Sequence, residues 1–184
     1  MTNIDYKVFQ QYASLYGLGV GLIWICSFYC SVLGIAVPGL GLVGDIYVVA
    51  GPVAAFYWAK KYRNNVLHGN ITFGSALYFL FSMYVYAVIL LAAGQFIYFT
   101  YIDRGFLYNT YKEILSQPAY QQMLRSMADP RQINTALEQF REATMRPIGM
   151  VFGFMGFHLV VSFILSFFCA LFLKRDVLKR VGLR

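Results

Sequence analysis

Apolar residues in this chain gather in four long segments separated by polar connections. The segments cover about residues 13–37, 39–59, 72–101 and 147–173. Each reaches the ~20 predominantly apolar residues that a helix needs to cross about 30 Å of hydrocarbon. Together they contain one charged residue, Asp45, and one histidine, His158. The pattern predicts an all-α fold, a polytopic membrane helical bundle with four transmembrane helices in a single integral membrane domain over residues 1–184.

The connection between the first two spans, residues 37–41, contains Pro38 and two glycines. Proline and glycine end helices and favour turns, so the first two spans are predicted to form a tight antiparallel hairpin. The first apolar segment is also much longer than the 7–15 apolar residues of a signal peptide. We therefore expect it to be a retained span.

The polar segment between the third and fourth spans, about residues 102–146, has helical periodicity of its own. Asp103 precedes a first apolar stripe, Pro118 can begin a second helix, and Asp129-Pro130 is a typical start for a third. The stripes consist of Leu107, Tyr111, Ile114 and Leu115, then Tyr120, Met123, Leu124 and Met127, then Ile133, Leu137 and Phe140. Such periodicity predicts a short amphipathic helical insertion, lying on the bilayer surface or over the end of the bundle.

Composition supports a membrane protein and narrows the chemistry. Hydrophobic residues make up 59% of the chain and charged residues 12%, against about 25% charged in soluble domains. The three cysteines all lie in apolar segments without a CxxC pair: Cys26, Cys30 and Cys169. We find no nucleotide-binding, hydrolase or metalloprotease motif. The sequence therefore predicts no catalytic residue, no cofactor and no metal site.

The distribution of basic residues predicts the orientation. Lys and Arg number 15 against 8 Asp and Glu, for a net charge of +7. Basic residues collect on the cytoplasmic side of membrane spans, which explains the charge without a nucleic-acid partner. The densest groups flank the spans and comprise Lys60, Lys61 and Arg63 after the second and Lys174 and Arg175 after the fourth. They place both termini in the cytoplasm and the 102–146 loop outside, and they suit anionic lipid headgroups.

Polar residues inside the spans are the candidate functional groups. Asp45 either lies near a helix N-terminus in the headgroup region or serves proton coupling or ligand binding. A polar stripe on the third span either packs against neighbouring helices or lines a hydrated groove; it consists of Ser75, Tyr78, Ser82 and Tyr86. Gln95 lies on another face of that span, and His158 is read first as a hydrogen-bonded histidine of the bundle.

Two GxxxG pairs are candidates for helix packing. Gly17 and Gly21 lie in the first span, and Gly149 and Gly153 lie in the fourth. Glycine lets two helix backbones approach closely in a membrane. These faces predict packing within the bundle, with dimerisation as the alternative.

Two segments resemble a known family. The stretch from Tyr62 to Gly74 resembles a recurrent "YR…GG-x-I-S-F-G-x-A" loop, and that from Tyr98 to Leu107 resembles a "YiYF-x-x-I-D-P-G-F-L" segment. Both are similar to an uncharacterised bacterial family of small four-helix integral membrane proteins, catalogued only as a domain of unknown function. This chain has His68 where the family often has Gly, and Arg104 where it often has Pro. The resemblance implies an inner-membrane location and a loose association with envelope glycosyltransferases.

Three functions follow from these patterns. The first is a non-catalytic inner-membrane subunit or scaffold of an envelope complex, with membrane lipid and another membrane protein as partners, possessing no enzymatic chemistry of its own. The alternative is a small homodimeric transporter, flippase or channel subunit that uses Asp45, the Ser75–Tyr86 stripe and His158. A lipid-modifying enzyme, with Asp45 or Asp103 as the candidate functional residue, is the second alternative.

Overall fold

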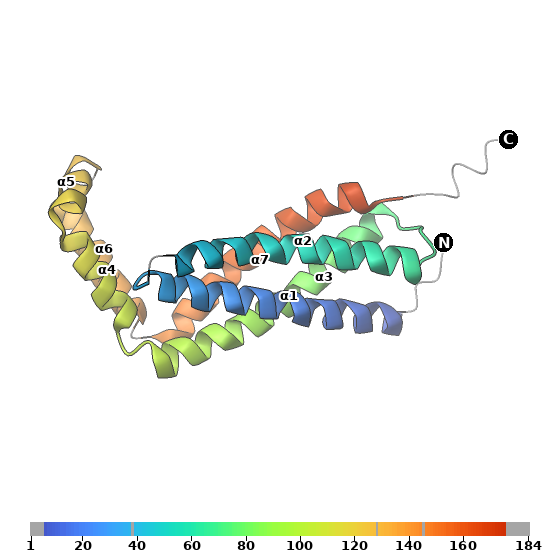
Figure 1. Ribbon diagram of the computed structural model, residues 1–184, viewed down its shortest axis with the longest axis horizontal. Helices are drawn as coiled ribbons and strands as arrows, with labels where there is room; N and C mark the ends of the chain where they lie inside the picture. Colours follow the sequence, from blue (N-terminus) through green and yellow to red (C-terminus); the bar gives the residue numbers. More distant parts are fainter. Residues whose placement is uncertain (1–5, 38, 128, 145, 176–184) are drawn as a thin grey trace. The chain divides into compact units, whose positions relative to one another are not determined.

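The computed structural model describes residues 6–37, 39–127, 129–144 and 146–175, and regular structure in these ranges is helical. The elements are α1 (Tyr6–Gly34), α2 (Leu40–Asn65), α3 (Phe73–Ile97), the π-helix η1 (Tyr98–Ile102), α4 (Phe106–Ser116), α5 (Pro118–Met127), α6 (Pro130–Thr144) and α7 (Pro147–Leu173). Within the described residues, four helices are long and apolar enough to cross a membrane: α1, α2, α3 continued by η1, and α7 (Figure 1). The predicted fold class is confirmed.

The chain divides into two compact units. One, here called the bundle unit, comprises Met1–Ala92 and Met155–Arg184, and the other, the loop unit, comprises Ala93–Phe154. The bundle unit contains α1, α2, most of α3 and most of α7. The loop unit contains η1, α4, α5 and α6 with the adjoining ends of α3 and α7.

Small residues hold α1 and α2 together as a hairpin. The two helices run side by side in Figure 1. Gly34 lies directly against the backbone of Gly41, and Gly44 leaves room for Ser31. Ser27 is buried and donates a hydrogen bond of 2.8 Å from its Oγ to the carbonyl oxygen of Gly44. At the start of α2, the N-cap Gly39 has a φ of 104°, a conformation that favours glycine.

Aromatic side chains fill the core of the bundle unit. Trp24 of α1 stacks on Tyr84 of α3 with ring centroids 5.6 Å apart. Its indole nitrogen fills the space that a side chain at Gly51 of α2 would need. Towards the other end, Tyr62 of α2 stacks on Phe79 of α3 at 4.2 Å. Such flat contacts add to the burial of large apolar surfaces, so they fix α1 and α2 against α3.

The ends of α2 and α7 are tied together by polar contacts. The buried Arg63 donates a hydrogen bond of 3.0 Å from a guanidinium nitrogen to the carbonyl oxygen of Leu173, where α7 ends. Beside it, Ile71 and Arg175 exchange two backbone hydrogen bonds of 3.0 Å. These contacts satisfy carbonyl groups that the end of a helix leaves without partners. We call this cluster of Arg63, Ile71, Leu173 and Arg175 the clasp.

Local capping residues organise the loop unit. Asp129 accepts a hydrogen bond of 2.8 Å from the backbone N–H of Arg131 at the start of α6, as its sequence position predicts. Phe140 of α6 contacts Tyr111 of α4 edge-to-face, with ring centroids 5.7 Å apart. The expected insertion of amphipathic helices between the third and fourth long helices is present.

Candidate functional site

Asp45 lies on the outward face of α2. Its side chain is exposed, as are its neighbours Leu42 and Ile46, which are 69% and 68% exposed. It is the sixth residue of α2, beyond the first turn, so the helix dipole favours its negative charge little. The carboxylate therefore faces the surroundings of the bundle rather than its core.

The polar stripe of α3 faces the N-terminal half of α1. The hydroxyl of Tyr86 donates a hydrogen bond of 2.7 Å to Oε1 of Gln10. The amide nitrogen of Gln10 in turn donates one of 2.9 Å to the hydroxyl of Tyr6. Tyr78 stacks on Phe9 with ring centroids 5.1 Å apart. Tyr78 and Tyr86 therefore both lie at the contact between α3 and α1.

Ser75 lies at the start of the helix that carries the stripe. Its hydroxyl accepts a hydrogen bond of 3.0 Å from the hydroxyl of Thr72, which also accepts the N–H of Ser75 at the start of α3. Thr72 therefore caps this helix, and Ser75 is its partner. Ser82, the other serine of the stripe, is half-buried.

The other two polar candidates occupy different places. His158 is half-buried on α7, and its ring lies 5.9 Å from that of Trp24. Gln95 is buried in the loop unit. Asp45 on the outer face of α2, Tyr86 against α1 and His158 against Trp24 are therefore not gathered around one cavity.

The two GxxxG faces have different surroundings. A Cβ added at Gly17 would lie 2.5 Å from the carbonyl oxygen of Met83 and 2.7 Å from Cβ of Tyr86. One added at Gly21 would lie 3.0 Å from the carbonyl oxygen of Ala87. This face is packed against α3. Around Gly149 and Gly153, an added Cβ would meet no atom of the described residues within 4 Å.

The basic residues that flank the spans also separate into two kinds. Lys60, Lys61, Lys174 and Arg175 are exposed, so they can contact headgroups. Arg63 is only 8% exposed, and its guanidinium is engaged with Leu173 in the clasp. A role of Arg63 in fixing α7 was not evident from the sequence, because its partner lies more than a hundred residues away.

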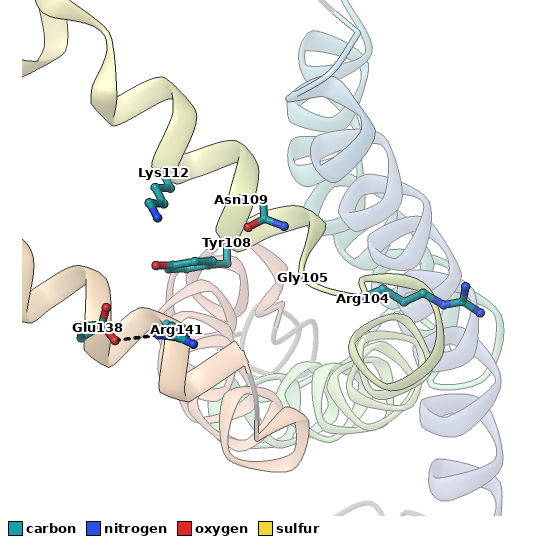
Figure 2. A pocket seen from close by; sticks show the side chains of 7 residues that line it. All are labelled: Arg104, Gly105, Tyr108, Asn109, Lys112, Glu138 and Arg141. Atoms are coloured by element: carbon teal, nitrogen blue, oxygen red, sulfur yellow. Dashed lines mark ion pairs between the residues drawn. The ribbon is translucent and has the colours of Figure 1, made fainter.

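A basic cleft lies in the loop unit between α4 and α6. It has a volume of about 550 Å³ and is lined by Arg104, Gly105, Tyr108, Asn109, Lys112, Glu138 and Arg141. Figure 2 shows Tyr108 and Lys112 of α4 facing Glu138 and Arg141 of α6. Glu138 and Arg141 form an ion pair of 3.5 Å. The Lys112 nitrogen lies 5.9 Å from the centre of the Tyr108 ring, within range of a cation–π attraction.

Asp103 builds the turn from which this cleft begins. It is 4% exposed and accepts hydrogen bonds from the hydroxyl of Tyr98 at 3.2 Å and from the backbone N–H of Leu107 at 3.0 Å. Its other carboxylate oxygen accepts the N–H of Gly105, whose φ is 86°. The carboxylate thus caps α4 and fixes the position of Arg104. This structural role differs from the role in a lipid-modifying enzyme for which the sequence made Asp103 a candidate.

The residues that line the cleft are not among the functional candidates that the sequence indicates. One local signal was present: Tyr108 and Lys112 lie four residues apart, on one face of α4. The contribution of α6 has no such signal, since the pairing of α4 with α6 depends on packing around Phe140.

Comparison with known proteins gives one match. A family model described as "Protein of unknown function (DUF4199)" matches residues 15–175 of the chain. No curated protein and no solved structure matches it.

Proposed function

The chain belongs to the DUF4199 family of proteins of unknown function, and we propose that it is a non-catalytic membrane subunit. It would act as a scaffold in an envelope-associated complex of the bacterial inner membrane, with an enzyme of lipid-linked glycans as one partner class. The observation that carries this proposal is the open GxxxG face of α7, at Gly149 and Gly153. The match to the family supports a membrane protein without a defined activity.

The physical argument rests on the contrast between the two glycine faces. Apolar side chains gain nothing by leaving lipid for another helix, so helices associate in membranes where small residues permit close backbone contact. The face at Gly17 and Gly21 makes this contact inside the chain, against α3. The face at Gly149 and Gly153 offers the same geometry, with the exposed side chains of Ile148 and Phe152 beside it. A transmembrane helix of another protein fits this face.

The packing of the bundle core favours the scaffold hypothesis over the transporter hypothesis. A transport route needs polar groups around one hydrated path, and the aromatic stacks of Trp24 on Tyr84 and Tyr62 on Phe79 fill the core instead. Asp45 faces outward. We therefore expect Asp45→Asn to leave the assembled complex intact. Loss of a proton-coupled flux in Asp45→Asn proteoliposomes would instead favour the transporter.

Replacing Gly153 by leucine is expected to release the partner. A leucine side chain would hold the partner helix several ångströms away and remove most of the close contact. The measurement is affinity purification of the tagged chain from its native membrane in gentle detergent, followed by native mass spectrometry. We expect a stoichiometric second membrane protein with the wild type and its loss with Gly153→Leu.

The matched control is Gly74→Leu, another glycine of a long helix whose added Cβ would meet no atom of the described residues. It lies outside both GxxxG pairs, so its complex should persist. A monomer in both wild type and variants would contradict the proposal. A homodimer that carries a small molecule would favour the transporter.

The proposed orientation places both termini in the cytoplasm. In a chain whose native cysteines are replaced, we expect a cysteine at Gln121 of α5 to react with an impermeant thiol reagent in intact spheroplasts. One at Asn65, the end of α2, should react only after lysis, because the basic residues around it favour the cytoplasmic side. The reverse labelling pattern would invert the orientation.

A further inference from the structure

We propose that the basic cleft between α4 and α6 binds the phosphate group of an anionic lipid. The cleft belongs to the loop unit alone and is independent of the α7 face. Its ligand class is a phosphodiester headgroup with a net negative charge, and its binding groups are Lys112, Arg141 and Tyr108.

The charge of the lining residues sets the preference for an anion. Two cations whose side chains lie at the cleft, Lys112 and Arg141, stand against one acid, Glu138, while the guanidinium of Arg104 points away from it in Figure 2. The difference of two and one leaves a net charge of +1. Arginine and lysine supply the donors that phosphate oxygens accept, and the planar guanidinium can donate two parallel hydrogen bonds.

The geometry offers those donors from two sides. In Figure 2, Lys112 and Tyr108 project from α4 and Arg141 projects from α6 into the space between the helices. The aromatic contacts of Phe140 with Tyr108 and Tyr111 hold the two helices at a fixed separation. A preorganised pair of facing cations loses little side-chain freedom on binding.

The source of the phosphate follows from the place of the cleft along the chain. The third apolar helix ends at Ile102, and Arg104 begins the cleft just beyond it. Tyr101, Ile102 and Phe106, which flank this turn, are 67%, 53% and 36% exposed. Tyrosine at a span end is typical of the headgroup level of a bilayer. A cationic cleft beside exposed apolar side chains matches a molecule with a phosphate head and an acyl tail.

The test uses the full chain purified in a non-ionic detergent. Native mass spectrometry measures the affinity for short-chain phosphatidylglycerol and for short-chain phosphatidylcholine, which differ in net charge at the same chain length. Each basic residue near an anionic headgroup contributes about fivefold in affinity. We expect one phosphatidylglycerol per chain, bound on the order of tenfold more tightly than phosphatidylcholine.

Substitutions that change the charge of the cleft in opposite directions distinguish an effect on lipid binding from an effect on folding. Lys112→Gln should weaken phosphatidylglycerol binding about fivefold, whereas Glu138→Gln should strengthen it by a similar factor, since it removes the competing acid. The matched control is Arg131→Gln on α6, an exposed residue outside the cleft lining. It should change the affinity by less than about twofold. A gain of affinity in Glu138→Gln cannot come from damaged folding.

Several results would overturn the proposal. Equal affinity for the two lipids would show that the protein does not distinguish them by the net charge of the headgroup. Equal weakening by Lys112→Gln and Arg131→Gln would place the lipid elsewhere on the chain. Inorganic phosphate that binds as tightly as phosphatidylglycerol and displaces it would assign the cleft to a free phosphate compound instead of a lipid.

Discussion

Gly17→Ala is expected to lower the free energy of unfolding of the bundle by about 2 kcal/mol. The new Cβ would lie 2.5 Å from the carbonyl oxygen of Met83, a backbone atom that cannot turn aside as a side-chain tip can. The α1 and α3 backbones must therefore separate, which also stretches the hydrogen bond between Tyr86 and Gln10. Unfolding of the purified protein in mixed micelles by increasing fractions of sodium dodecyl sulfate measures the change.

A graded series of alanine variants tests the cause. Gly21→Ala places its Cβ 3.0 Å from the carbonyl oxygen of Ala87, so its effect should be smaller than that of Gly17→Ala. Gly74→Ala meets no atom of the described residues within 4 Å. It should be neutral or stabilising by a few tenths of a kcal/mol, because alanine restricts the unfolded chain more than glycine does. Equal effects at all three positions would contradict close packing of α1 on α3.

Arg63→Met is expected to destabilise the bundle by about 2–3 kcal/mol. The substitution keeps the length and apolar stem of the side chain but removes the charged donor that Leu173 accepts at the end of α7. A buried carbonyl is then left without a partner, and the favourable charge at the helix C-terminus is lost. The same detergent titration measures the loss of stability. Faster hydrogen exchange at the paired amides of Ile71 and Arg175 should accompany it.

Two neighbouring variants make the result specific. Arg63→Lys keeps the charge but has a less extended donor group, so it should retain part of the stability. Lys61→Met removes an exposed cation from the same helix and should change stability by less than about 0.5 kcal/mol. If Arg63→Met and Lys61→Met behave alike, the clasp does not stabilise the bundle.

Helix positions were well predicted where a local signal exists. The fourth span was expected over residues 147–173, and α7 covers the same residues because Pro147 starts it and the basic tail follows its end. Pro118 and Asp129-Pro130 marked the starts of α5 and α6. The first two helices extend beyond the predicted spans, to Tyr6 and to Asn65. Polar and aromatic residues continue these helices beyond the apolar segments, which a hydropathy pattern does not report.

The orientation of each long helix about its axis was far less predictable. A soluble helix shows its buried face as an apolar stripe, but a helix surrounded by lipid is apolar on every side. The outward position of Asp45 therefore had no periodic signal. The GxxxG spacing marked Gly17 as a packing position but did not identify Met83 as its partner. The amphipathic helices of the loop unit do have apolar stripes, so Phe140 was correctly expected on an apolar face.

The sequence by itself determined the class of protein, the number of long apolar helices and the helical insertion, because length, hydropathy and capping act over a few neighbouring residues. The tertiary structure decided which GxxxG face packs against another helix of the chain. It also decided that Arg63 bonds the last carbonyl of α7 and that Lys112 faces Arg141 across a cleft. Each of these depends on the rotation and spacing of helices that are distant along the chain. Such arrangements are set by the packing of complementary surfaces, and no local pattern of residues encodes them.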